Sequence, residues 1–287
     1  MDFSGIWIPL VTPLRGGSVD LSALARLVKH LATQGVAGFV PCGSTGEAAM
    51  LSPDEQQQVL ATTLQAADGL PVICGVAGTQ PQSALARMAQ AVHAVDDADG
   101  LKAFLLTAPA YVKPSQAGIE DFFRQVAHAA PRPLVVYDIP SRTGVRIEPA
   151  TLQALASHPR IVAVKDCSGD RSAAEALLAD GRLAWLAGND DELFDQLARG
   201  ARGAIVATAH LATADFVALH RAFAQGRLDT ARSLWRRLAP LTRDAFAEPN
   251  PAPLKAALAR QGWLANELRT PMRPAAAATA EALLSRL

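Results

Sequence analysis

The chain has 287 residues, of which half are hydrophobic and 19% are charged. This composition is sufficient for a large buried core, and the length fits one domain of about 200–250 residues with an extension. The 27 Lys and Arg residues balance the 27 Asp and Glu residues, so the net charge is zero. No basic surface for nucleic acid or for an anionic membrane is therefore indicated.

The cysteines and histidines disfavour a metal centre. Cys42, Cys74 and Cys167 include no C-x-x-C pair, so they suggest neither a disulfide framework nor a zinc site. The six histidines are scattered, without an HExxH pattern. No signal peptide is recognisable, and no uninterrupted apolar run reaches membrane-spanning length. We therefore expect a cytoplasmic protein that uses no metal.

Short apolar runs alternate with amphipathic segments along the first four-fifths of the chain. The expected strands are 6–10, 38–42, 72–75, 103–106, 134–137, 161–165, 183–187 and 204–207. Helical periodicity lies between them, as at 21–31, 53–64, 83–95, 118–129 and 211–224. Eight strands, each followed by a helix and without antiparallel hairpin signals, predict an α/β fold of the (β/α)8 TIM barrel type. The alternative fold is a doubly wound open sheet. It is less favoured, because no G-x-G-x-x-G follows the first strand.

The alternation stops near Leu228. Segments 230–241, 253–261 and 274–287 have the pattern of helices separated by Pro and Gly. We expect two units, a catalytic barrel over 1–226 and a C-terminal helical domain over 227–287. The helical domain is expected to pack on the barrel and to support oligomer contacts.

A lysine ends one of the apolar strands. Residues 161–166 read IVAVKD, and a strand of this kind is buried on both faces in a parallel sheet. Burial disfavours the ammonium form and lowers the pKa of a lysine, so the amine of Lys165 can attack a carbonyl and form a Schiff base. The alternative, from this segment alone, is that Lys165 extends its charged end into solvent.

Two further strand ends carry functional groups. Tyr137 ends an apolar strand and precedes a turn that carries Arg142. A phenol can transfer protons, and a guanidinium can hold a carboxylate through two hydrogen bonds. After the strand at 38–42, the sequence GSTGE (43–47) offers backbone N–H groups and hydroxyls to an anion, although it lacks the Gly-Lys-Ser/Thr of a Walker A loop. Each pattern by itself is common.

In a TIM barrel, catalytic groups lie where the strands end at their carboxyl termini. The candidates follow this rule, with Ser44 and Thr45 after the second strand, Tyr137 and Lys165 at the ends of the fifth and sixth, and Gly188 after the seventh. These residues are distant in sequence, so their convergence on one mouth is stronger evidence for a site than any single motif.

Five segments carry a resemblance to a known family: 43–47 (GSTGE), 109–116 (PAYVKPSQ), 137–144 (YDIPSRTG), 163–166 (AVKD) and 248–255 (EPNPAPLK). Together they resemble the pyruvate-dependent class I aldolases, the superfamily of dihydrodipicolinate synthase and N-acetylneuraminate lyase. The resemblance spans almost the whole chain. It is closest to the synthases, because Arg142 matches the arginine that holds the carboxylate of aspartate semialdehyde, which the sialic-acid lyases usually lack.

The resemblance implies a mechanism and a set of site residues. Lys165 would form a Schiff base with pyruvate, and the resulting enamine would attack L-aspartate semialdehyde to give 4-hydroxy-tetrahydrodipicolinate. The implied catalytic residues are Lys165, Tyr137, Ser44, Thr45 and Tyr111, the last from a neighbouring subunit. The implied substrate-binding residues are Ser44, Thr45, Arg142, Gly188 and Ile205. The family needs no separate cofactor, and a homotetramer built as a dimer of dimers is expected.

Four positions depart from the usual synthase pattern: Ser44 for threonine, Ala110 for an aromatic residue, Asp138 for asparagine and Asp166 for glutamate. They keep open an aldolase or dehydratase that acts on 2-keto-3-deoxy sugar acids or 4-hydroxy-2-oxo acids. A noncatalytic keto-acid sensor is a third alternative, which a reactive lysine disfavours. Inhibition by L-lysine is expected to be weak or absent, because polar ligands of lysine-inhibited relatives are replaced by Ala48, Pro53, Gln56 and Ser83.

Overall fold

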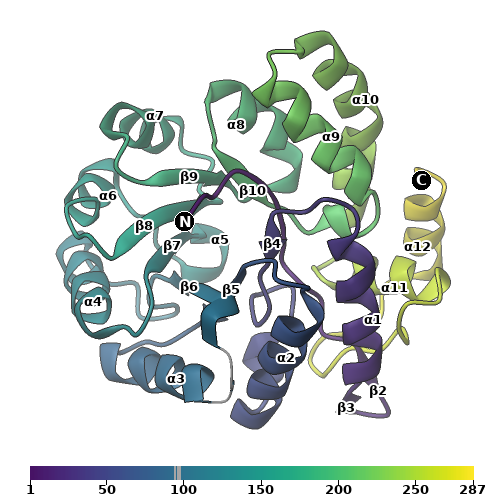
Figure 1. The fold of residues 1–287 in the computed structure, drawn as a ribbon, viewed down its shortest axis with the longest axis horizontal. Coiled ribbons are helices and arrows are strands. Elements are labelled where there is room, and N and C mark those ends of the chain that lie inside the picture. Colours follow the sequence, from purple (N-terminus) through teal and green to yellow (C-terminus); the bar gives the residue numbers. More distant parts are fainter. Residues whose placement is uncertain (94, 96–97) are drawn as a thin grey trace.

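The computed structural model describes residues 1–93, 95 and 98–287. Eight parallel strands close into a barrel in the order β1-β10-β9-β8-β7-β6-β5-β4, with β4 paired to β1 (Figure 1). The strands are β1 (Gly5–Ile8), β4 (Gly38–Phe39), β5 (Val72–Val76), β6 (Leu101–Thr107), β7 (Leu134–Asp138), β8 (Ile161–Asp166), β9 (Ala184–Ala187) and β10 (Gly203–Ile205). The predicted (β/α)8 TIM barrel is confirmed.

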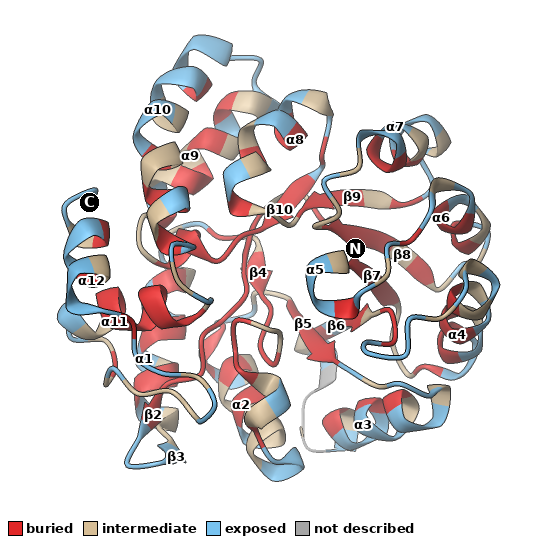
Figure 2. Cartoon of the chain, turned by 180° about the vertical axis from the view of Figure 1, so that it is seen from behind, coloured by how far each residue is buried: buried red, intermediate tan, exposed pale blue. Residues whose placement is uncertain are grey.

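Helices surround the barrel on its outside (Figure 1). They are α1 (Leu21–Ala32), α2 (Pro53–Ala66), α3 (Pro81–His93), α4 (Gln116–Ala129), α6 (Pro149–Leu155), α7 (Arg171–Asp180), α8 (Leu193–Arg199) and α9 (Thr213–Ala224). The short helix α5 (Pro140–Thr143) follows β7 and lies inside this ring, at the end of the strand (Figure 2). A capping box starts α2, where the Ser52 hydroxyl accepts from the Glu55 N–H and the Glu55 carboxylate accepts from the Ser52 N–H. Of the predicted helix 83–95, residue 94 lies outside the described residues.

Two local expectations were wrong. The predicted strand 38–42 is regular only over Gly38–Phe39, because Pro41 has no N–H to donate and Cys42 adopts a left-handed φ of +58°. An antiparallel hairpin, β2 (Leu14–Arg15) with β3 (Ser18–Val19), follows the first barrel strand. Its turn consists of two glycines at φ +59° and +80°, which is the backbone that a two-residue hairpin requires.

Alternate residues of each strand face opposite sides of the barrel wall. The inward-facing side chains form one apolar cluster, which includes Trp7, Val40, Ile73, Leu105, Val135, Leu186 and Ile205. The outward-facing side chains pack against the helices in a second, larger cluster. Figure 2 shows this arrangement, with buried strands at the centre and helices that expose one face. The inner cluster fills the barrel below the ends of the strands.

Three helices complete the chain, α10 (Leu228–Ala245), α11 (Ala252–Arg260) and α12 (Ala277–Leu284). All three were predicted, but the last is shorter than 274–287. They share the outer cluster with the barrel through residues such as Leu241 and Leu254, and Trp263 stacks on the His30 ring of α1 at 4.3 Å between centroids. The division into domains 1–226 and 227–287 stays a prediction. Within the described ranges, every helix is too short or too polar to cross a bilayer.

Candidate active site

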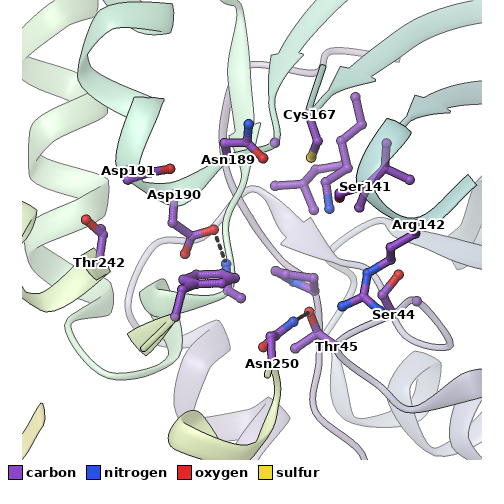
Figure 3. Close-up of a pocket in the computed structure, with 18 of the residues that line it drawn as sticks. Ser44, Thr45, Ser141, Arg142, Cys167, Asn189, Asp190, Asp191, Thr242 and Asn250 are labelled. Carbon is purple, nitrogen blue, oxygen red and sulfur yellow. Dashed lines mark hydrogen bonds between the residues drawn. The ribbon is translucent and has the colours of Figure 1, made fainter. Parts of the chain in front are cut away.

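A cavity of about 720 Å³ opens at the carboxyl ends of the barrel strands. The strand ends and their loops form one wall, and residues from the end of α10 and the segment after it form the other (Figure 3). Seven of the residues singled out in the sequence line it: Ser44, Thr45, Tyr137, Arg142, Lys165, Gly188 and Ile205. The structure thus brings these residues together at one mouth of the barrel, and their roles stay predictions.

Lys165 and Tyr137 are neighbours across the β7–β8 pairing, and both face inward. The Lys165 Nζ atom lies 4.3 Å from the centroid of the Tyr137 ring. The lysine is 6% exposed, and this burial, together with the charge of Arg142, lowers its pKa. The alternative in which Lys165 extends into solvent is wrong. A buried amine with a lowered pKa is the state in which lysine is nucleophilic.

The Tyr137 hydroxyl lies within a small polar group. Burial raises the pKa of this phenol well above its usual value, so it carries its proton at neutral pH. The polar Ser44 side chain, which lines the same cavity, acts in the opposite direction and favours the ionised phenol. The Cys167 Sγ atom lies 4.0 Å away on the other side. Tyr137 can therefore donate a proton to a group bound beside Lys165, and Ser44 can stabilise the phenolate that this leaves.

The loop that carries Ser44 and Thr45 is tightly folded. Gly46 N–H donates to the Gly43 carbonyl at 3.1 Å, and Glu47 N–H to the Ser44 carbonyl at 3.2 Å. In the described part of the chain, the backbone N–H groups of Ser44 and Thr45 donate to no protein acceptor. Two free N–H groups beside a cavity can bind an anion such as a carboxylate.

Gly188 is required by the close approach of two strand ends. A Cβ atom at this position would lie 2.5 Å from the Cys167 Sγ atom and 2.7 Å from the Asp166 carbonyl oxygen. It would also lie 3.0 Å from Cγ of Lys165. The absence of a side chain at 188 therefore leaves the space through which the lysine reaches the cavity.

Arg142 lies at the mouth of the cavity, on the short helix α5, near Ser44 (Figure 3). The helix ends at Gly144, whose φ of +76° suits glycine. Through its positive charge, the guanidinium adds to the effect of burial in lowering the pKa of Lys165, and it partly opposes the effect of burial that raises the pKa of Tyr137. It can hold a carboxylate on the side of the cavity that faces solvent.

Asp190 is a buried carboxylate in the cavity wall that the sequence did not reveal as functional. It accepts hydrogen bonds from the backbone N–H groups of Ala207 and Thr208, so it ties the loop after β9 to the loop after β10. Burial raises its pKa, and the charge of Lys165 opposes this effect. The only signal was its place directly after Gly188 and Asn189, at a strand end.

The sequence of the whole chain agrees with this geometry. It matches the model of the Dihydrodipicolinate synthetase family over residues 2–287. The chain belongs to this family. The 4-hydroxy-tetrahydrodipicolinate synthase of Hyphomonas neptunium is 38% identical over 287 residues, which cover 98% of this chain and 96% of the relative.

Solved structures of the family superpose closely on this chain. The chloride-inhibited dihydrodipicolinate synthase of Acinetobacter baumannii, complexed with pyruvate, has a TM-score of 0.93 at 32% identity and covers 99% of this chain and 97% of its own. A dihydrodipicolinate synthase variant described as the first monomeric one has a TM-score of 0.93 at 31% identity, with 99% of this chain and 95% of its own covered. The family resemblance of the five sequence motifs is therefore confirmed.

Tyr111 is the one candidate that does not reach the cavity of its own chain. It lies in the loop between β6 and α4, is 94% exposed and has a left-handed φ of +72°. Its part in catalysis stays a prediction that requires a second copy of the chain.

Asp138 and Asp166, two of the departures from the synthase pattern, face away from the cavity, toward the helices. They are a register pair on β7 and β8, one residue beyond the inward pair. Asp166 accepts hydrogen bonds from Ser168 and from the indole N–H of Trp185. Neither aspartate lines the cavity, so their charges touch no substrate there.

Sequence reasoning missed residues on both walls of the cavity. They include Asn189, Asp190, Asp191 and Glu192 in the loop after β9, and Thr242, Arg243, Phe246 and Asn250 at the end of α10 and in the segment after it. Asn250 lies within the motif at 248–255, which supported the family resemblance but indicated no role. The residues from α10 carry no motif, and only the packing of that helix brings them to the cavity.

Proposed function

We propose that the protein is a 4-hydroxy-tetrahydrodipicolinate synthase, which condenses pyruvate with L-aspartate semialdehyde through a Schiff base on Lys165. The observation that carries the proposal is the buried Lys165 amine, with its lowered pKa, beside Tyr137. Its family relatives carry the name of this activity over nearly their whole length. The structure of the Acinetobacter relative was solved with pyruvate, the substrate that the lysine would bind.

The first half of the reaction forms the Schiff base. The Lys165 amine attacks the ketone carbon of pyruvate, whose carboxylate is held by the N–H groups of Ser44 and Thr45. Tyr137 donates its proton to the carbonyl oxygen, and water leaves to give the iminium. Because the iminium is the electron sink for the next step, no separate cofactor is required.

The second half forms the carbon–carbon bond and the ring. A proton leaves the pyruvate methyl group to the Tyr137 phenolate, and the resulting enamine attacks the aldehyde carbon. Arg142 holds the carboxylate of the semialdehyde during this attack. The aldehyde oxygen takes a proton, relayed through Tyr137, Ser44 and Thr45. The substrate amine then adds to the iminium carbon and displaces the Lys165 amine, which closes the ring. The one water released per ring is the water that left when the iminium formed.

We place the protein in the cytoplasm as a homotetramer, a dimer of dimers, in which Tyr111 of one chain joins the proton relay of another. The exposed Tyr111 and Val112 support such a contact. One structural neighbour is described as monomeric, so the fold alone does not require the assembly. Specific activity that falls when the protein is diluted to monomer supports the shared site, and unchanged specific activity contradicts it.

The test is turnover with pyruvate and L-aspartate semialdehyde, coupled to the downstream reductase and followed by loss of NADPH. We expect turnover that Lys165→Ala abolishes. No turnover, combined with borohydride trapping of pyruvate on Lys165, would transfer the assignment to the sugar-acid aldolases. No trapping at all would favour a keto-acid sensor.

A further inference from the structure

The C-terminal segment contacts the loop that carries Ser44 and Thr45 at two points, Glu47 and Thr45. At the first point, the fully buried Lys255 donates from Nζ to Glu47 Oε1 at 2.6 Å and to the Thr12 carbonyl at 2.9 Å. The other oxygen of Glu47 accepts from the backbone N–H of Arg269 at 3.2 Å. Glu47 is 2% exposed and has a left-handed φ of +56°, so this end of the loop is held in a conformation that it would not adopt freely.

The second contact is made to Thr45, which is one of the proposed catalytic residues. The Asn250 side chain donates from Nδ2 to Thr45 Oγ1 at 3.0 Å, across the cavity wall and 205 residues along the chain (Figure 3). Thr45 is 5% exposed, so bulk solvent has little access to its hydroxyl. Asn250 also lines the cavity, and its Oδ1 atom is buried without a hydrogen-bond partner among the described residues.

The direction of this hydrogen bond determines where the Thr45 proton can point. An amide N–H only donates, so Thr45 must accept from Asn250 through a lone pair of its oxygen. A threonine hydroxyl has one proton, and that proton is then free to bond with a different acceptor. Thr45 lines the cavity together with Ser44 and Tyr137, so the proton that Asn250 leaves free can be offered to a group on that side.

We propose that Asn250 is a positioning residue for the reaction. Its amide fixes the Thr45 hydroxyl as an acceptor at the wall and so directs the Thr45 proton into the cavity, toward the Ser44–Tyr137 pair. The Glu47–Lys255 pair fixes the backbone from which that hydroxyl projects. The C-terminal segment is thus part of the catalytic geometry as well as a covering of the barrel. This inference rests on the function proposed above, in which Thr45 takes part in proton transfer.

The matched variants are Asn250→Asp and Asn250→Ala, each made alone and combined with Thr45→Val. Aspartate has the shape of asparagine, but its carboxylate only accepts, so the Thr45 proton would turn toward it and leave the cavity. We expect kcat to fall about 10–100-fold in Asn250→Asp, less than the roughly 100- to 10,000-fold loss of a whole proton-transferring group, with little change in the KM for pyruvate. Asn250→Ala should fall less, because water can replace the amide donor.

The double variant separates positioning from a merely structural role. Once Thr45→Val has removed the hydroxyl, Asn250→Asp should lower kcat no further, because the two residues act through one hydrogen bond. Losses that multiply would overturn the proposal, as would wild-type kcat in Asn250→Asp. If Asn250→Asp does not fold, the cycle with Asn250→Ala gives the same decision. Arg260→Ala is the control, since it removes an exposed C-terminal ion pair with Glu281, 3.8 Å apart, and should leave kcat unchanged.

A second measurement keeps this test distinct from the assignment of the second substrate. The rate at which borohydride traps pyruvate on Lys165 needs no aldehyde, and it also depends on proton transfer in the cavity. If the wild-type protein traps pyruvate but does not turn over L-aspartate semialdehyde, the proposed function fails. The positioning role is then decided by whether Asn250→Asp slows the trapping and whether Thr45→Val removes that effect.

Discussion

Two pairs of ionisable residues lie one position apart on β7 and β8, and they differ in almost every property. The inward pair, Tyr137 and Lys165, lines the cavity, and burial lowers the pKa of the amine and raises that of the phenol. The outward pair, Asp138 and Asp166, packs against helices outside the cavity. Because side chains alternate along a strand, two neighbouring residues face opposite sides of the barrel wall. One therefore lines the cavity, and the next is buried outside it.

Asp138 and Asp166 do not line the cavity, and Asp138 shows how burial changes the pKa of a carboxyl outside the site. Asp166 has hydrogen-bond donors for both carboxylate oxygens. Asp138 has one donor, the Ile147 N–H, and its Oδ2 atom has no partner among the described residues. Burial, with the nearby charge of Asp166, raises the pKa of Asp138 to about 7. A strongly shifted pKa near an active site is therefore insufficient evidence of catalysis.

The largest effect on activity is expected from replacing Lys165, the lysine of the inward pair. Lys165→Met should abolish turnover and pyruvate trapping, since Lys165 is the one lysine among the described residues that line the cavity with Tyr137. The melting temperature should stay equal or rise, because a buried amine is replaced by an apolar chain of similar volume. Mass spectrometry after borohydride treatment gives the trapping result. A pyruvate adduct on the variant would contradict the assignment.

Lys255 is also buried, but we expect its replacement to reduce stability rather than remove the reactive amine. Lys255→Met leaves Glu47 as an unpaired buried carboxylate, and we expect it to lower the free energy of unfolding by about 3–5 kcal/mol. Denaturant unfolding measures this loss. Lys165 should still trap pyruvate in whatever fraction remains folded. A Lys255 variant as stable as the wild-type protein would show that the pair contributes little.

Tyr137→Phe tests the phenol of the inward pair. Removal of the hydroxyl takes away the proton donor and leaves the ring that packs beside Lys165. We expect kcat to fall by about 100-fold or more, which is the usual contribution of a proton-transferring group. Pyruvate should still be trapped on Lys165, only more slowly. A variant with wild-type kcat would assign the proton transfer to another residue.

Asp138→Asn should have the smallest effect on activity and a pH-dependent effect on stability. The folded pKa, about 7, is above the unfolded value of about 3.9, so the folded state binds the extra proton. The stability of the wild-type protein should therefore fall as pH rises from about 4 to about 7 and stay low above that range. The neutral amide should remove this loss, so the variant should be the more stable protein at pH 8.

Melting temperatures of the two proteins from pH 5 to pH 8 measure this difference, and kcat measured in parallel should change little. A large loss of kcat in Asp138→Asn would mean that the outward pair does contribute to catalysis. In that case the separation between the two faces of the strands is incomplete.

The residues whose roles were predictable belong to local patterns. The apolar run before Lys165 indicates a buried strand, and the GSTGE loop and the turn at Arg142 follow strand ends, so a barrel topology brings them together. Hydrophobic periodicity and turn residues involve only a few neighbouring positions, so they can be recognised in a single sequence.

Other features depended on the tertiary structure. The Asn250–Thr45 contact joins positions 205 residues apart, and Asp190 is held by backbone groups of the neighbouring strand's loop. The outward direction of Asp138 and Asp166 follows from the strand register, since a slip of one residue would turn them inward. The sequence by itself thus determined the barrel, the buried lysine at the end of its strand and the family. Only the packing of helices against the barrel decided which C-terminal residues complete the cavity, because such contacts depend on the whole core and leave no local pattern.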